Sequence, residues 1–422
     1  MFSKGTRALF RYKAFIAITL GVVTHGASIA RARECLFVAN VGLGISEVVA
    51  IDAAAMRIAA TYEIGEEATG LVIDPEHGLL YVSHAIESGE VSIVSALTGK
   101  ILRTVAVGPF PSAVAIAPDH QRLYVLNADQ TVSIVNTTTH AIATVPVPQR
   151  SRGLLQGFAF TSTGGLFVAS CPPGICVVDG SSGQIVNRIE VSILTDSDVM
   201  ALATHGNTLF AAVRSGETVP DIIPGAVAVV PFSENRVVDS INTLELPSAI
   251  AVSPDGTRLY ATLPCHRNPH CTDGQVAIFD TATHDRLDTL FVPSEPYFLV
   301  LTTDGRTAWV SDPDAGVYAI DTTAKIAGPA LAIPFARGMT IGSLVECAEG
   351  QPTPTPTETT TPHCPGDCNM DGEVSIDELM HGVLVALGGD AMGDCGLDVD
   401  GDGLVMVNEL IAGVGAALGD CA

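Results

Sequence analysis

A five-residue apolar motif recurs along the chain and constrains the fold more than any other feature. Successive copies are 44, 43, 43, 43, 50 and 49 residues apart. Short alternating segments follow each copy, with Gly, Pro and Asp between them, which is typical of β-strands joined by turns. The copies are LFVAN at 36, LYVSH at 80, LYVLN at 123, LFVAS at 166, LFAAV at 209, LYATL at 259 and AWVSD at 308.

Each unit holds four strand-like segments. In one unit they are SAVAIAP (112–118), LYVLN (123–127), VSIVN (132–136) and AIATVPV (141–147), in that order. A repeat of about 40 to 45 residues with four strands is the signature of a β-propeller blade. Seven units therefore predict an all-β, seven-bladed propeller over residues 31–349.

The LYV motifs and turns such as SPDG (253–256) resemble the YVTN-type β-propeller family. The resemblance covers about residues 36–345 and implies the architecture. It implies little about activity, because this fold carries many unrelated functions.

The two ends of the repeat region predict how the ring closes. The chain enters at a second strand (36–40), and its last segment, RGMTIGSLVEC (337–347), matches a first strand. Cys35 and Cys347 both fall in the turn that is missing between these strands. We predict a disulfide there, which in the loop-entropy model contributes on the order of 4 to 5 kcal/mol. Two unrelated buried cysteines are the alternative.

Residues 1–30 have the pattern of a signal peptide. Four basic residues, from Lys4 to Lys13, precede an apolar run (14–23) and small residues that suit cleavage after Ala30 or Ala32. The alternative, a membrane anchor, needs roughly 20 apolar residues, about twice this run. We therefore expect a secreted, periplasmic or cell-surface protein without a transmembrane anchor.

The charge of the chain limits its partners. Removing residues 1–30 changes the formal net charge from −25 to −29, so nucleic acid is not expected as a partner. Residues 363–422 hold twelve Asp or Glu, and no Lys or Arg follows Arg337. Such a tail is suited to cations. The segment QPTPTPTETTTP (351–362) has no residue for a core, so 350–363 is predicted to be a Pro/Thr-rich linker before a module at 364–422.

The tail contains two twelve-residue loops with the ligand spacing of an EF-hand. Calcium takes six to eight oxygen ligands, and alternate carboxylates, a glycine for the turn and a closing glutamate supply them. We predict two Ca²⁺ ions. The first loop would use Asp367, Asn369, Asp371, Ser375, Glu378 and the carbonyl of Glu373, and the second Asp398, Asp400, Asp402, Glu409 and the carbonyl of Leu404.

The two loops are duplicated at an offset of 31 residues, and each is followed, but not preceded, by a helical pattern. Residues 364–421 therefore resemble a dockerin, which implies a small all-α calcium-binding docking module. Typical dockerins carry a small hydroxyl pair where this chain has Ile376 with Asp377 and Val407 with Asn408. This departure argues against a cohesin as the partner, so the partner is an unknown extracellular or cell-surface protein or glycan.

Ten cysteines in an exported chain favour disulfides. The short loops CPPGIC and CHRNPHC predict the pairs Cys171–Cys176 and Cys265–Cys271, although the second loop also offers a metal-site alternative with His266 and His270. Four cysteines remain in the tail, with three possible pairings: Cys364, Cys368, Cys395 and Cys421.

Residues at the start of each first strand are expected to ring the mouth of the channel. Asp198, Tyr297 and Arg337 are the candidate ligand-binding residues among them, and no catalytic residue is predicted. A propeller enzyme, such as a lactonase-like hydrolase with a metal at this mouth, is the alternative, but it needs several converging carboxylates, Asn or His, and only Asp198 qualifies. The aligned ring is Thr69, Ser112, Gln156, Asp198, Ser248, Tyr297 and Arg337.

Together these features predict an exported, calcium-binding protein that acts in extracellular binding or surface assembly. The propeller would recognise a ligand, and the dockerin-like module would attach the protein to a partner. An enzyme is the less favoured class.

Overall fold

The computed structural model describes residues 33–348, apart from the gaps 42–45, 148–156, 162–165, 172–173, 180–181, 183, 192, 195–197, 216–224, 265–273, 293–294, 314 and 334–335. The chain divides into two units, Met1–Glu349 and Gly350–Ala422, and every described residue lies in the first. The predicted signal peptide, linker and calcium loops lie outside the described residues.

One sheet is built from both ends of the repeat region. Its strand order is β28 (Ala336–Leu344), β1 (Arg33–Val41), β2 (Ser46–Asp52) and β3 (Arg57–Gly65). β1 and β28 pair antiparallel, with Leu36 opposite Ile341. The predicted ring closure is therefore confirmed: the last strand completes the first sheet.

The other sheets are each made from one continuous segment, so that the described strands form seven four-stranded antiparallel sheets. Three of them lie in the first half of the chain. They are β4 (Ala68–Asp74), β5 (Leu79–His84), β6 (Glu90–Ser95) and β7 (Ile101–Ala106); β8 (Ala113–Ile116), β9 (Arg122–Asn127), β10 (Thr131–Asn136) and β11 (Ile142–Pro146); and β12 (Phe158–Phe160), β13 (Leu166–Cys171), β14 (Gly174–Val178) and β15 (Ile185–Glu190).

Three more sheets follow in the second half. They are β16 (Asp198–His205), β17 (Thr208–Arg214), β18 (Gly225–Pro231) and β19 (Asp239–Asn242); β20 (Ala249–Val252), β21 (Arg258–Leu263), β22 (Gly274–Asp280) and β23 (Arg286–Val292); and β24 (Leu299–Leu301), β25 (Thr307–Asp312), β26 (Gly316–Asp321) and β27 (Ile326–Ala327).

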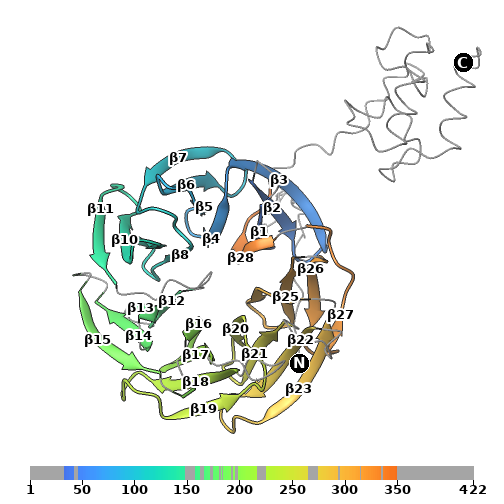
Figure 1. Cartoon of the computed structure of the whole chain (residues 1–422). Helices are drawn as coiled ribbons and strands as arrows, with labels where there is room; N and C mark the ends of the chain where they lie inside the picture. Colours follow the sequence, from blue (N-terminus) through green and yellow to red (C-terminus); the bar gives the residue numbers. More distant parts are fainter. Residues whose placement is uncertain are drawn as a thin grey trace, which may run out of the picture. The chain divides into compact units, whose positions relative to one another are not determined.

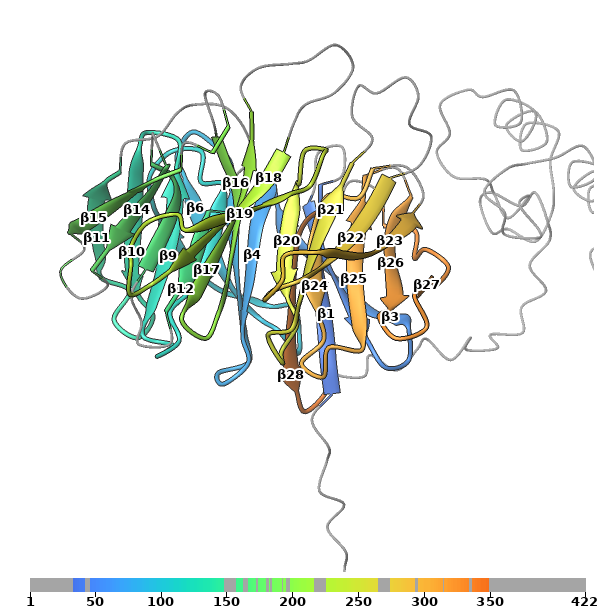
Figure 2. The same cartoon turned by 90° about the horizontal axis from the view of Figure 1, so that it is seen from below.

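The sheets stand around a central opening, which makes the fold a β-propeller (Figure 1). First strands such as β4, β8 and β16 face the opening, and fourth strands such as β7 and β15 form the rim. Seen from the side, the strands run between the two faces of the ring (Figure 2). The expected all-β propeller is confirmed.

The core lies between neighbouring sheets, and the repeated motif supplies much of it. A second strand has a partner on each side and a sheet against each face, so its large side chains lose contact with water. The aromatic residues of the motif are accordingly almost fully buried. They include Phe37, Tyr81, Tyr124, Phe210, Tyr260 and Trp309.

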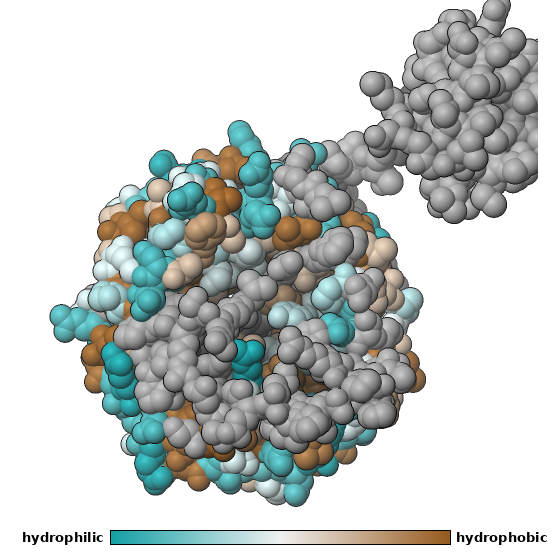
Figure 3. Space-filling model, viewed as in Figure 1, coloured by the Kyte–Doolittle hydropathy of each residue, from teal (hydrophilic) through white to brown (hydrophobic). Residues whose placement is uncertain are grey.

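The outermost strands expose several large apolar side chains, such as Ile101 and Leu102 on β7, Val186 on β15 and Phe291 on β23. On the face in Figure 3, hydrophilic and hydrophobic residues alternate around the described part of the rim. Of the residues that the structure describes, none belongs to a helix of the length and apolarity that crossing a membrane requires.

Candidate functional site

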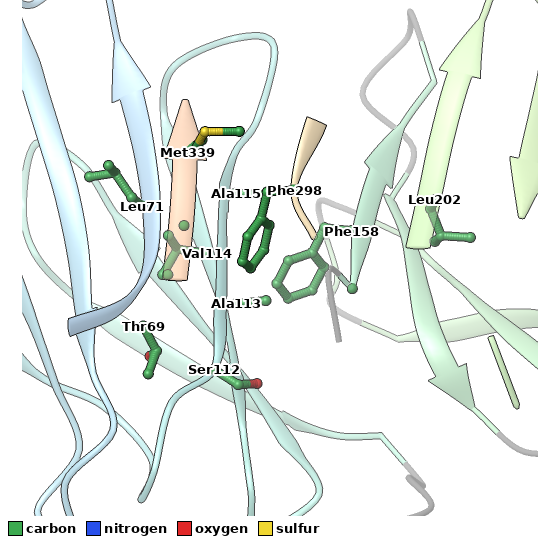
Figure 4. A pocket seen from close by; sticks show the side chains of 13 residues that line it. Thr69, Leu71, Ser112, Ala113, Val114, Ala115, Phe158, Leu202, Phe298 and Met339 are labelled. Carbon is green, nitrogen blue, oxygen red and sulfur yellow. The ribbon is translucent and has the colours of Figure 1, made fainter. Parts of the chain in front are cut away.

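A pocket of about 190 Å³ opens among the innermost strands. Its lining comes from strands far apart in the sequence, because the first strands of the sheets lie around the central opening (Figure 4). Leu71, Val114, Phe158 and Met339 lie on β4, β8, β12 and β28. The full lining is Thr69, Gly70, Leu71, Ser112, Ala113, Val114, Ala115, Gly157, Phe158, Leu202, Phe298, Gly338 and Met339.

The side chains that line the pocket are apolar except at one end. Phe158 and Phe298 lie near one another, and Thr69 and Ser112 lie together at the opposite end from Met339 (Figure 4). These two hydroxyls are the side-chain hydrogen-bonding groups among the lining residues. The arrangement fits an apolar group that carries a hydrogen-bonding end, because such a group replaces its water contacts at both ends of the pocket.

Small hydroxyl residues of the predicted ring also connect neighbouring sheets. Thr69 Oγ1 donates to the carbonyl of Pro111, 2.9 Å away in the segment that leads into the next sheet. Ser248 repeats this contact, with its Oγ 3.0 Å from the carbonyl of Pro296. A buried hydroxyl needs such a partner, so these residues have a structural role whatever the pocket binds.

A buried phenol joins two sheets in the same way. The hydroxyl of Tyr62, on β3, donates to the carbonyl of Ala96, which follows β6, at 3.0 Å. Burial removes water from the phenol and raises the pKa of Tyr62 to about 12. The hydroxyl therefore remains a donor throughout the physiological pH range.

The three candidate ligand-binding residues are not placed together by a described contact. Asp198 is the first residue of β16, opposite Arg214, and Arg337 lies in β28, but both side chains are outside the described ones. Tyr297 is half-buried, and its ring packs against Phe298, with 5.4 Å between the centroids. Phe298 lines the pocket. The binding role of the three residues stays a prediction.

The apolar lining was missed at the sequence level, although the sequence carries a signal for it. A first strand runs along the channel and rises about 3.3 Å per residue, so the residue two positions after a ring residue lies one layer further along the channel. Leu71 follows Thr69, Val114 follows Ser112 and Met339 follows Arg337 at this spacing. The ring positions alone predicted a polar mouth, and the next layer is the pocket.

The disulfide predictions have different outcomes. Cys35 and Cys347 are bonded, with their Cα atoms 5.2 Å apart, which confirms that pair. Cys176 is also disulfide-bonded, but the side chain of Cys171 lies outside the described ones. Cys265, Cys271, the cysteines of the tail and all predicted calcium ligands lie outside the described residues.

Comparison with known proteins supports the fold alone. No protein-family profile matches the sequence, and no curated protein matches it. Among solved structures, the chain is similar to a hydrazine synthase of Kuenenia stuttgartiensis, with a TM-score of 0.52 and 21% sequence identity. The alignment covers 60% of this chain and 76% of that chain. At this identity the likeness shows a shared propeller architecture.

Proposed function

We propose that this chain is an exported, calcium-binding protein whose propeller recognises a ligand and whose tail attaches it to a partner outside the cell. The seven described sheets would be the seven blades of a YVTN-type propeller. The Cys35–Cys347 bond supports export, because disulfides form and persist in oxidising compartments.

The axial pocket is the observation that carries the recognition role. It combines an apolar wall with the hydroxyls of Thr69 and Ser112 at one end. A volume of about 190 Å³ holds a few non-hydrogen atoms, such as a side chain of a partner or the end of a small molecule. We therefore propose a partner that inserts an apolar group with a polar tip.

The test of this role fills the pocket without changing the rim. Val114→Trp would occupy the space between β4 and β8, and Val186→Trp is the matched control, since Val186 is 63% exposed on β15. The full-length wild type, Val114→Trp and Val186→Trp proteins are each used to capture proteins and glycans from the native secretome, and the captured molecules are compared. We expect Val114→Trp alone to lose the ligand. Equal capture by all three forms would exclude the pocket.

The attachment role rests on the two calcium loops and the dockerin-like duplication in the sequence. Two Ca²⁺ ions would organise residues 364–422, and the linker would let the two units bind separately. Isothermal titration of the full chain with Ca²⁺ should give two sites, and Asp398→Ala should remove one. If chelator changes neither stability nor partner capture, the calcium-dependent role is wrong, because an ion that binds only the folded form must stabilise it.

A further inference from the structure

Three metal-ligating side chains meet where two neighbouring sheets contact one another. Asp74 ends β4, His77 lies in the turn that follows, and His120 lies in the turn between β8 and β9. One ligand atom from each lies within 4.8 Å of the other two. Nδ1 of His77 and Nδ1 of His120 are each 2.8 Å from a different oxygen of Asp74.

The carboxylate of Asp74 is the buried centre of this cluster. Its side chain is 0% exposed, whereas those of His120 and His77 are 25% and 56% exposed. The backbone N–H groups of Glu76 and His77 donate to its Oδ1 at 3.1 and 3.3 Å. Two backbone N–H groups of its own turn thus hold the carboxylate in place. Solvent can reach the cluster past the exposed side chain of His77.

One nitrogen of the cluster has no hydrogen bond. Nδ1 of His120 is buried, and although it lies 2.8 Å from Asp74 Oδ1, the direction of the contact does not satisfy hydrogen-bond geometry. Buried polar atoms usually have a partner, and each exception calls for an explanation. His84 shows the ordinary case, since its two ring nitrogens contact the carbonyl of Glu66 at 2.7 Å and Ser92 Oγ at 2.9 Å.

The equivalent turns of other sheets show that the cluster departs from the repeat. Aligned on the motif of the second strand, the position of Asp74 is Ser253 in the β20–β21 turn and Thr302 in the β24–β25 turn. The position of His120 is Gly256 and Gly305 in those turns. Asp74 and His120 are therefore departures from small residues, and they meet His77, which precedes the left-handed Gly78 (φ +64°), at one point.

The backbone of His120 makes this departure costly. Its φ is +56°, in the left-handed region that Gly256 and Gly305 also occupy, with φ of +74° and +68°. A residue with a side chain is strained there, by roughly 1–2 kcal/mol, and glycine is not. The same position faces the preceding sheet in other turns as well, since a Cβ on Gly305 would lie 2.9 Å from Pro254. The fold thus aims this side chain at the neighbouring turn.

We propose that Asp74, His77 and His120 bind a divalent transition-metal ion, of which Zn²⁺ is the best match. Imidazole nitrogen and carboxylate oxygen are ligands that zinc prefers, and three such protein ligands leave one position for water or a further carboxylate. Glu76 contacts the other nitrogen of His120, with its Oε2 3.6 Å from Nε2, so water is the expected fourth ligand of an ion held at Nδ1. Zinc holds its ligands at about 2.0–2.2 Å, so neighbouring ligand atoms lie roughly 3.3–3.6 Å apart, and side-chain shifts of about 1 Å suffice.

The ion would add a direct link between two neighbouring sheets at the turns named above. Its ligands come from the turns that connect the first to the second strand of each sheet. None of the three residues lines the axial pocket or belongs to a predicted calcium loop, so the proposal does not depend on the function proposed above.

The test measures zinc binding to the full-length protein by isothermal titration in excess Ca²⁺, which keeps the calcium loops occupied. His120→Gly restores the residue of the equivalent turns, and His77→Ala removes an exposed ligand with little risk to the fold. His284→Gly is the matched control. His284 also has a positive φ, of +65°, and its Nδ1 is also 2.8 Å from an aspartate, Asp239, but no third ligand is present there among the described residues.

We expect wild type and His284→Gly to bind one more zinc ion than His120→Gly does. His77→Ala should lose at least as much affinity as the roughly 10- to 100-fold that removal of an outer-shell partner costs. Zinc should raise the melting temperature of wild type and His284→Gly but not that of His120→Gly. Equal zinc stoichiometry and affinity in wild type and His120→Gly, or no zinc binding by wild type, would overturn the proposal.

Discussion

The first and second strands of a sheet are joined differently at the ring closure and in a continuous sheet. Between β20 and β21 the chain runs through a short turn, in which Ser253 Oγ accepts the N–H of Arg258 at 3.0 Å and donates to Asp255 at 2.6 Å. Between β28 and β1 there is no turn, because the two strands come from opposite ends of the repeat region, and the Cys35–Cys347 bond takes its place.

The turn joins two strands that are close in the sequence, whereas the disulfide joins two strands from opposite ends of the repeat region. The turn orders a few neighbouring residues and needs only hydrogen bonds between them. The disulfide closes a loop with a sequence separation of 312, for which the entropy of the unfolded chain is the main opposing factor. The β4–β5 turn shows a third arrangement. Asp74 stands at the position of Ser253, and its carboxylate contacts His77 and His120.

The largest effect is expected at the ring closure. Cys35→Ser combined with Cys347→Ser should lower the free energy of unfolding by on the order of 4 to 5 kcal/mol, because the unfolded chain regains its loop entropy. Guanidinium unfolding of the full chain measures this difference in free energy. It is done without added oxidant or reductant, so that the disulfide of the wild type stays intact. An unchanged midpoint would show that β-strand pairing alone closes the ring.

A smaller loss is expected at the β4–β5 turn. Asp74→Ala leaves the N–H groups of Glu76 and His77 without their buried acceptor, so it should cost about 2 kcal/mol in the presence of chelator. Ser253→Ala is the comparison at the equivalent position, with an expected cost of about 1 kcal/mol for the lost bond from Arg258. Equal costs would mean that the carboxylate adds nothing to the turn.

The glycine position of these turns can be tested next. Gly305→Ala should cost about 1 to 2 kcal/mol, because φ is +68° and the new Cβ would lie 2.9 Å from Pro254. Gly78→Ala is the control for conformation alone, since φ is +64° and a Cβ there meets nothing within 4 Å. Thermal unfolding of both variants isolates the contact with the preceding sheet, and equal losses would argue against it.

The smallest effect concerns the pH dependence of the ordinary turn. Hydrogen bonds from Ser253 and Thr257 lower the pKa of Asp255 from 3.8 to about 2. A lowered pKa in the folded state means that the ionised carboxylate stabilises the turn above about pH 4 and that this contribution is lost as the pH falls through about 2.

Ser253→Ala removes the first of these bonds, so the pKa of Asp255 should rise toward its ordinary value. Carbon-detected NMR titration follows it, with Asp304 as the internal control, because the pKa of Asp304 is lowered by its own turn. If the pKa of Asp255 stays near 2, the hydrogen bonds from the backbone and side chain of Thr257 cause the shift instead.

Much of the fold follows from the repeat, and the reason is local. Each copy of the motif lies in the second strand of a described sheet, from β1 to β25, since alternation and buried aromatic residues act within a few residues of one another. The prediction of ring closure succeeded for the same reason, because an unpaired first strand and an unpaired second strand stand at the two ends of the pattern.

The axial pocket was only partly accessible to such reasoning. The ring residues Thr69 and Ser112 do line it, but its apolar wall was not predicted, since the wall depends on which residues of separate strands come together around the central opening. The calcium loops were identified from ligand spacing, and they remain predictions outside the described residues.

The sequence by itself determined the β-strands, their grouping into repeats and the cysteine pair at the ring closure, because these depend on periodicity and on the ends of a pattern. Only the tertiary structure decided that Asp74 and His120, which are 46 positions apart in the sequence, would contact one another. Neither residue belongs to a motif. The cluster exists because neighbouring sheets of a ring place equivalent turns side by side, and a left-handed residue of one turn then faces the carboxylate of the other.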